Sequence, residues 1–200
     1  MSSAPPLVLA STSRYRHELL SRLRLPFEVC SPEVDEATLP DETPSALALR
    51  LALAKAHAVA RLKPGAVVIG SDQVADLHGQ ALGKPGSHER AVLQLRRMRG
   101  QQVLFQTAVA VVRSDTGFER ALLATVKVTF RELGDAEIEH YLRIEKPYDC
   151  AGSAKCETLG IALLSAIESD DPTALIGLPL IRTCELLRQA GIDPLRTAAS

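Results

Sequence analysis

Residues 67–74 read VVIGSDQV and place a carboxylate directly after a run of three β-branched apolar residues. Such a run is typical of a strand buried inside a sheet. Burying an unpaired acid is costly in free energy, so buried carboxylates are usually paired, protonated or bound to a metal. We therefore expect Asp72 to lie at the end of a central strand, either as a satisfied structural acid or as part of a binding or catalytic site.

The composition predicts a globular protein without a strong charge bias. The chain has 200 residues, of which 46% are hydrophobic and 24% charged, and its formal net charge is -1. This balance gives no reason to expect a nucleic acid or a membrane surface as a partner. No apolar run has the length of a bilayer span, and the N-terminal stretch lacks the pattern of a signal peptide. We expect a cytoplasmic protein that forms one domain, with or without two lobes.

The cysteines and histidines do not match a known metal or redox motif. The four cysteines have no C-x-x-C spacing, and the five histidines have no H-E-x-x-H pattern. A zinc site or a thioredoxin-like site is therefore not expected. In a cytoplasmic protein, we expect the cysteines to be reduced thiols.

Apolar periodicity and turn residues predict strands and helices that alternate along the chain. Strands are expected at 7–10, 26–29, 66–72, 103–112, 121–130 and 160–167. Helices are expected after 11–13, from Pro44 behind a Thr43 cap, between Ser87 and Gly100, and at 135–144 and 178–190. Hairpin turns at 77–81 and 114–117 interrupt any uniform β-α-β order, so a mixed sheet is favoured over a doubly wound parallel one.

Side chains that can take part in binding or catalysis lie at the predicted ends of several elements. Hydroxyl and basic groups stand at the start of the first helix, acids follow the second strand, and lysines lie in a helix and after a hairpin. They include Ser11, Arg16, Glu33, Asp35, Glu36, Lys55, Lys84, Ser153, Lys155 and Glu157. Basic groups beside hydroxyls suit phosphate, and separate carboxylates suit Mg²⁺ or Mn²⁺. The pattern indicates phosphoryl chemistry on an anionic substrate.

Each of these residues also has a simpler explanation on its own. Arg16 and Lys55 could be solvated helix charges, and Ser11 could cap a helix. Asp72 differs, because the apolar run before it predicts at least partial burial. The chain has neither a Walker A sequence nor a G-x-G-x-x-G motif, so ordinary nucleotide-binding signatures are missing.

Six motifs, in the same order along the chain, resemble the Maf family of nucleoside triphosphate pyrophosphatases. They are LASTSRYR at 9–16, PEVDE at 32–36, IGSDQV at 69–74, GKP at 83–85, CAGSAKCETLGI at 150–161 and GLPL at 177–180. The resemblance implies one Maf-like domain over residues 1–200. It implies an α/β fold with an elongated mixed β-sheet, flanking helices and two lobes around a cleft, similar to inosine triphosphate pyrophosphatases. The implied reaction is hydrolysis of a nucleoside triphosphate to the monophosphate and pyrophosphate, with a divalent metal cation, Mg²⁺ or Mn²⁺.

The resemblance also implies roles for individual residues. The family's base would activate water, its basic residues would contact the phosphates, and its specificity positions would contact the nucleobase. The assignments are Asp72, Lys55 and Lys84 as catalytic residues, Ser11, Tyr15, Arg16, Gln73, Lys155 and Glu157 as substrate-binding residues, and Glu36 and Asp72 as metal ligands.

Two motifs distinguish this chain from the branch of the family that acts on dTTP and UTP. That branch carries Ala-Asp-Thr where this chain has 71–73, SDQ, and a pattern closer to AGAYGIQG where this chain has AGSAKCETLG. Both differences resemble the branch that hydrolyses 7-methyl-GTP. Tyr15 could stack on the cationic 7-methylguanine ring, and Glu157 could accept hydrogen bonds from the guanine N1–H and amine.

Two alternatives stay open at this point. One is a pyrophosphatase for dTTP, UTP or CTP, and the other is a nucleotide-binding regulator of cell division. The chain departs from the family pattern at Arg14, Tyr15 and His17, where proline, tryptophan and a second arginine are usual. The expected partner is the nucleotide substrate, with no nucleic acid and no membrane, and a homodimer is compatible with the sequence.

Overall fold

A mixed sheet of seven strands forms the centre of the computed structural model, which describes residues 5–196. The strands are β1 (Leu7–Ala10), β2 (Glu28–Cys30), β3 (Val67–Leu77), β4 (Gln80–Leu82), β5 (Gln102–Arg113), β6 (Phe118–Phe130) and β7 (Leu164–Glu168). Six follow the order β2-β1-β3-β5-β6-β7, and β4 pairs with β3. Strand β1 pairs in parallel with β2 and β3, and the other pairs are antiparallel. The predicted α/β fold with a mixed sheet is confirmed, and residues 1–4 and 197–200 of the predicted domain lie outside the described range.

Five α-helices flank the sheet within the described range. They are α1 (Arg14–Ser21), α2 (Pro44–Ala60), α3 (His88–Met98), α4 (Asp135–Glu145) and α5 (Leu180–Gln189), and short 3₁₀ helices are η1 (Ala151–Ser153), η2 (Leu159–Leu163) and η3 (Ala174–Ile176). The predicted start of α2 is confirmed, because Thr43 accepts a hydrogen bond from the Ala46 N–H and Pro44 is the first helical residue. None of the helices in residues 5–196 has the length and hydropathy needed to cross a bilayer.

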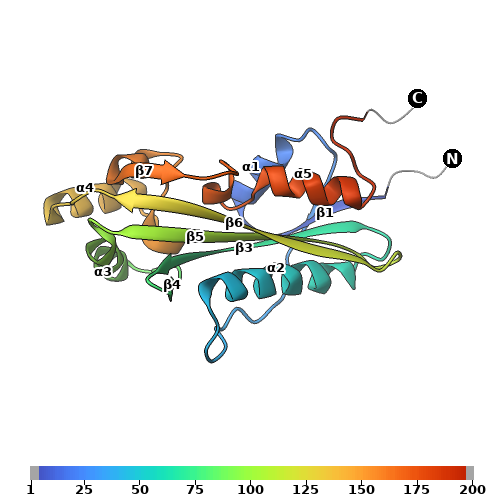
Figure 1. The fold of residues 1–200 in the computed structure, drawn as a ribbon, viewed down its shortest axis with the longest axis horizontal. Coiled ribbons are helices and arrows are strands. Elements are labelled where there is room, and N and C mark those ends of the chain that lie inside the picture. Colours follow the sequence, from blue (N-terminus) through green and yellow to red (C-terminus); the bar gives the residue numbers. More distant parts are fainter. Residues whose placement is uncertain (1–4, 197–200) are drawn as a thin grey trace.

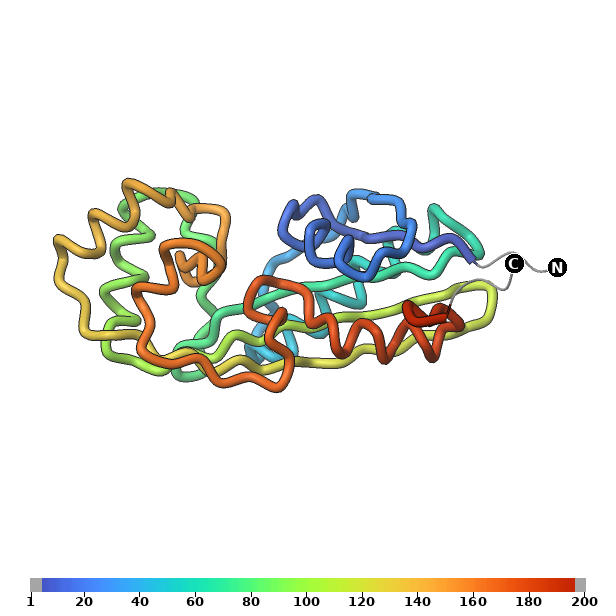
Figure 2. Tube along the Cα trace, turned by 90° about the horizontal axis from the view of Figure 1, so that it is seen from above, coloured from blue at the N-terminus to red at the C-terminus, as the bar shows by residue number. Residues whose placement is uncertain are grey.

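The apolar core is divided into three clusters that follow the long strands. One cluster packs α2 against one face of the sheet, and a second packs α1 and α5 against the opposite face (Figure 1). The third joins α3 and α4 to the far ends of β5 and β6. Viewed from above, α3, α4 and the segments around them form a lobe separate from that of α1, α2 and β1, and the long strands run through both (Figure 2). We refer to these as the second and the first lobe.

The strand that carries Asp72 is longer than its sequence predicts. We expected it to end at Asp72, but β3 continues to Leu77, so Asp72 lies in mid-strand and that prediction was wrong. The physical reason is the pairing of β3 with β5, which is unbroken from Val68 to Asp76. On its other edge, β3 pairs with β1 only as far as Gly70 and with β4 only from Ala75. Residues 71–74 are therefore paired on one edge and open on the other, and Asp72 lies in this opening.

The chain before β7 also differs from the expected strand at 160–167. Residues 159–163 form the 3₁₀ helix η2, and the strand begins only at Leu164. Gly160 lies so close to the backbone of Lys155 that a Cβ at this position would overlap it. This tight turn prevents an extended conformation and delays the start of the strand.

Helix α2 packs closely against β3 at Gly70. A Cβ at Gly70 would overlap the carbonyl oxygen of Ala52 and the backbone nitrogen of Ala56. Because glycine has no side chain, the helix backbone can lie directly on the strand at this point. Lys55 comes immediately before Ala56, so the same close approach places its side chain beside the open edge of β3.

Gly70→Ala should therefore lower the free energy of unfolding. We expect a loss at the upper end of the about 1–3 kcal/mol typical of overpacking, because both overlapped atoms belong to the helix backbone. The matched control is Gly83→Ala, since a Cβ at Gly83 has nothing within 4 Å. Urea unfolding of the two variants measures the difference. Equal free energies of unfolding would show that α2 and β3 are not in tight contact at Gly70.

Candidate active site

A cavity of about 750 Å³ lies between the two lobes. The first lobe contributes the start of α1, the loop before α2, one face of α2 and the open edge of β3. The second lobe contributes the end of β4 and the segment 149–157, and the wall is completed by 175–177. The predicted site residues that line it are Ser11, Tyr15, Arg16, Glu36, Lys55, Asp72, Gln73, Lys84 and Glu157. Residues that lie far apart in the sequence are thus gathered around one space.

Asp72 forms an ion pair with Lys55, and Lys55 also pairs with Glu36. The Lys55 Nζ atom lies 2.6 Å from Asp72 Oδ1 and 2.6 Å from Glu36 Oε1. Asp72 and Lys55 are only 7% and 6% exposed, so each charge depends on its partner for stabilisation. The second oxygen, Asp72 Oδ2, makes no hydrogen bond to any residue among 5–196 and is available to a group in the cavity. Asp72 is therefore a satisfied acid that also lines the cavity.

Glu36 is held in its charged form by the cations around it. Burial by itself would raise the pKa of its carboxyl, but Lys55, with smaller effects from Lys84 and Arg16, lowers the pKa below the usual 4.5. A lowered pKa in the folded state stabilises the fold above the ordinary pKa and loses this effect as the pH falls through the lowered value. The Glu36 carboxyl is therefore ionised at neutral pH.

Arg16 is fixed by contacts at the start of α1. Its Nε donates a hydrogen bond to the Gly177 carbonyl (2.9 Å), and its Nη1 lies 3.5 Å from Ser11 Oγ. Ser71 Oγ lies 3.0 Å from the same Gly177 carbonyl. Burial lowers the pKa of Arg16, and the charges of Asp72 and Glu36 oppose that shift. The guanidinium is thereby oriented along the cavity wall beside the hydroxyl of Ser11.

Gln73 is anchored through its amide nitrogen. This nitrogen lies 3.0 Å from Thr107 Oγ1, 2.9 Å from the Ala174 carbonyl and 3.0 Å from the Leu175 carbonyl. Thr107 is fully buried and itself donates to the Ala174 carbonyl (3.0 Å). The amide donors of Gln73 are thus used within the protein, and its carbonyl oxygen is the group left for a ligand.

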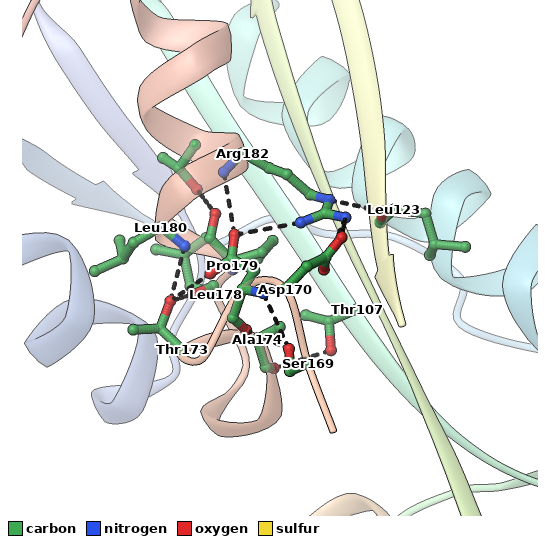
Figure 3. Close-up of polar contacts among 12 residues, drawn as sticks. Thr107, Leu123, Ser169, Asp170, Thr173, Ala174, Leu178, Pro179, Leu180 and Arg182 are labelled. Carbon is green, nitrogen blue, oxygen red and sulfur yellow. Dashed lines mark hydrogen bonds and ion pairs between the residues drawn. The ribbon is translucent and has the colours of Figure 1, made fainter. Parts of the chain in front are cut away.

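A polar network in the segment between β7 and α5 surrounds the part of the wall formed by 175–177 (Figure 3). Thr173 Oγ1 accepts from the Leu180 N–H and lies 2.8 Å from the Leu178 carbonyl. Arg182 Nε donates to the Leu123 carbonyl (2.8 Å), and the backbone N–H of Arg182 donates to the carboxylate of fully buried Asp171 (3.1 Å). Our sequence reasoning missed these residues, and only the nearby GLPL motif marked the region.

Tyr15 presents an aromatic ring to the cavity, with Arg14 against it. The guanidinium carbon of Arg14 lies 4.7 Å from the ring centroid, and its Nη2 donates to Tyr15 Oη (2.9 Å). This is a cation–π contact combined with a hydrogen bond. Arg14 therefore covers one face of the ring, and stacking of a base on Tyr15 would use the other face. His17 packs its ring against Phe27, with centroids 5.2 Å apart, and is outside the cavity lining.

The second lobe places Lys84 and Glu157 on the opposite side of the cavity, and both are exposed. Cys156 Sγ lies 3.7 Å from Glu157 Oε2. Burial, followed by the charge of Glu157, raises the pKa of Cys156 to about 12, so the thiol stays protonated. Lys155 is the predicted site residue outside the lining, because its ammonium donates to the Glu145 carbonyl at the end of α4 (2.9 Å). A contact between Lys155 and substrate stays a prediction.

Comparison with known proteins identifies the family to which this chain belongs. Residues 6–190 match the family model described as Maf-like protein, and the chain belongs to the Maf family. The chain is 72% identical to a 7-methyl-GTP pyrophosphatase of Polaromonas sp. (strain JS666), over 94% of this chain and 85% of the relative. It is 66% identical to the protein of the same name from Albidiferax ferrireducens, over 94% and 95% of the two chains. A third protein of that name, from Thiobacillus denitrificans, is 57% identical over 99% and 98%.

The contact between Lys55 and Asp72 generates a prediction about stability. Lys55→Met should lower the free energy of unfolding by about 3 kcal/mol, the low end for a broken buried pair, because cavity water reaches the two carboxylates. The double variant Lys55→Met/Asp72→Asn should be more stable than Lys55→Met alone, since it no longer buries a lone charge. Urea unfolding at neutral pH measures both. Losses that simply add in the double variant would contradict a direct pair.

Proposed function

We propose that this protein hydrolyses 7-methyl-GTP to 7-methyl-GMP and pyrophosphate. The observation that carries the proposal is that the Asp72–Lys55 pair, the aromatic ring of Tyr15 and the exposed carboxylate of Glu157 all line one cavity. The names of the relatives that share 57–72% of their residues with this chain support the same substrate. Hydrolysis of dTTP, UTP or CTP, and a role limited to regulating cell division, are not favoured by these relatives.

The proposed reaction is attack of water on phosphorus, with Asp72 as the base. Its free Oδ2 atom would accept the proton of the water as the new oxygen–phosphorus bond forms. The anhydride bond between the α- and β-phosphates breaks, and its electron pair leaves with pyrophosphate. Lys55, Lys84 and Arg16 would neutralise the charge that develops on the phosphate oxygens. Ser11 and the backbone at the start of α1 would add hydrogen bonds to the same oxygens.

Glu36 and Asp72 have the chemistry of a site for a divalent cation. Within the described residues, no group of three or more His, Cys, Asp or Glu side chains is arranged to hold a metal. Mg²⁺, however, is commonly held by one or two carboxylates together with substrate phosphates, and two carboxylates converge here on one ammonium. We propose that Glu36 and Asp72 hold Mg²⁺ or Mn²⁺ when the nucleotide is present. Such an ion would supply further charge neutralisation at the phosphates.

The proposed selection of the base uses Tyr15, Glu157 and Gln73. The aromatic ring would stack on the cationic 7-methylguanine, which gains from both stacking and charge. Glu157 would accept two hydrogen bonds from the adjacent donors of the guanine edge, and Gln73 would offer its carbonyl oxygen. Lys155 would act on the substrate only after leaving its contact with Glu145. Cytoplasmic location and assembly as a homodimer remain predictions.

Asp72→Asn should abolish most turnover while the protein stays folded. The change is nearly isosteric and removes only the negative charge and the basicity, so we expect kcat to fall by about 10²–10⁴-fold. Pyrophosphate release from 7-methyl-GTP with Mg²⁺ or Mn²⁺ measures it. The matched control is Asp76→Asn in the same strand, because Asp76 is outside the cavity lining and accepts from the Gly79 N–H. If the folded Asp72 variant keeps kcat within tenfold of the wild type, Asp72 is not the base.

Glu157→Gln should change selectivity more than rate. Uracil offers an acceptor, a donor and an acceptor, so the Glu157 carboxylate would repel its carbonyl groups, whereas an amide can donate to them. We expect kcat/KM for 7-methyl-GTP to fall and kcat/KM for UTP to rise, and the ratio of the two is the quantity to measure. The control is Glu168→Gln, which is in β7 and outside the cavity lining. An unchanged ratio would refute the role of Glu157 in base selection.

A further inference from the structure

Two segments of the second lobe that line the cavity are joined by one side chain that does not line it. The first segment is 82–84, which ends in Lys84, and the second is 149–157, which ends in Glu157. Between them lies Gln94 of α3. Its Nε2 donates to the Gly83 carbonyl (2.9 Å), and its Oε1 accepts from Ser153 Oγ (2.6 Å). We call these two hydrogen bonds the Gln94 bridge.

One end of the bridge, Gly83, is next to a predicted site residue. The other end, Ser153, is held firmly within its own segment. Gly83 is adjacent to Lys84 in the chain. Ser153 is fully buried and has a positive φ of 55°, so its position depends on specific contacts. Tyr141 Oη donates to the Ser153 carbonyl (3.1 Å) and accepts from the Lys155 N–H (3.0 Å). The position of Ser153 is thus transmitted to the backbone just before Glu157.

A second connection joins the chain just outside the same two segments. The Gly86 N–H donates to the Tyr148 carbonyl (3.0 Å), and Tyr148 Oη lies 3.0 Å from His88 Nδ1. Glu139 Oε2 of α4 lies 3.1 Å from the other ring nitrogen of His88. Because these contacts do not involve Gln94, removal of the Gln94 bridge would release Gly83 and Ser153 without separating the lobe. The bridge is therefore placed to set position rather than to hold the fold.

We propose that Gln94 is a positioning residue that holds Lys84 and Glu157 at a fixed separation, so that the phosphate and base contacts are made together. This inference rests on the proposed function of these two residues. Gln94 itself does not touch the cavity, and both ends of its amide are used in the bridge. It acts on substrate only through the two segments that it joins.

The test compares Gln94→Met with Gln80→Met. Methionine keeps the length of the side chain and removes both hydrogen bonds of the bridge. Gln80→Met is the matched control. Gln80 in β4 is exposed, lies outside the lining and accepts a single hydrogen bond from Arg97 of α3, the helix that also carries Gln94 (2.8 Å). We expect Gln94→Met to lower kcat for 7-methyl-GTP by about 10- to 100-fold, as a displaced catalytic group does. Equal kcat values for the two variants would overturn the proposal.

Two further variants separate positioning from a general loss of stability. In Gln94→Glu the side chain still accepts a hydrogen bond from Ser153, but a carboxylate oxygen then lies against the Gly83 carbonyl and repels it. We therefore expect kcat to fall while the preference for 7-methyl-GTP over UTP is kept. In a Lys84→Ala background, the effect of Gln94→Met on kcat should largely disappear, because the group that it positions is gone. Full additivity of the Lys84 and Gln94 effects would show that Gln94 does not act through Lys84.

A measurement without substrate distinguishes failure of this inference from failure of the proposed function. Amide hydrogen exchange should be faster in both 82–86 and 149–157 of Gln94→Met than of Gln80→Met, because the bridge protects both segments. If the wild type hydrolyses none of the nucleotides, the proposed function fails, and faster exchange in both segments still supports the bridge. Unchanged exchange in 149–157 would overturn the bridge whatever the activity.

Discussion

The ion pairs of Lys55 with Asp72 and Glu36 are the interaction on which the rest of the site depends. The three residues come from a helix, a strand and a loop, so one ammonium joins three separate parts of the first lobe. A buried lysine and a buried aspartate would each be strongly destabilising alone, and the pair offsets that desolvation. The contact forms because Gly70 lets α2 lie directly on β3. The packing of α2 on β3 and the ion pairs of Lys55 therefore favour the same position of the helix on the strand.

The cavity exists because β3 changes its partner along one edge. Strand β1 stops pairing at Gly70, and β4 begins only at Ala75. The residues between them keep full pairing with β5, so the backbone is rigid on one side and accessible on the other. Asp72 and Gln73 are thus carried by one of the most firmly held strands of the sheet, which suits groups that must keep their position.

The local features of the fold could be predicted from sequence, and the long-range ones could not. The cap at Thr43 and the turn at 114–117 depend on neighbouring residues, and both predictions are confirmed. The motifs also identified most of the residues that line the cavity. The continuation of β3, the anchoring of Gln73 and the bridge made by Gln94 depend on partners far away in the chain. A single sequence shows no signal for such contacts, because each residue alone is typical of a strand or of a helix surface.

The unbroken hairpin of β5 and β6 limits how the protein can respond to a substrate. The two strands are in register from Gln102–Thr129 to Arg113–Phe118 and pass through both lobes (Figure 2). The lobes are therefore not separate bodies on a flexible linker, and bringing them together would require bending a paired sheet. Any adaptation to a nucleotide is therefore expected in the segment at 31–43, which borders the cavity outside the sheet and has no helix or strand. The paired strands thus set the distance between the two lobes, and the cavity keeps nearly the same width whether or not a ligand is bound.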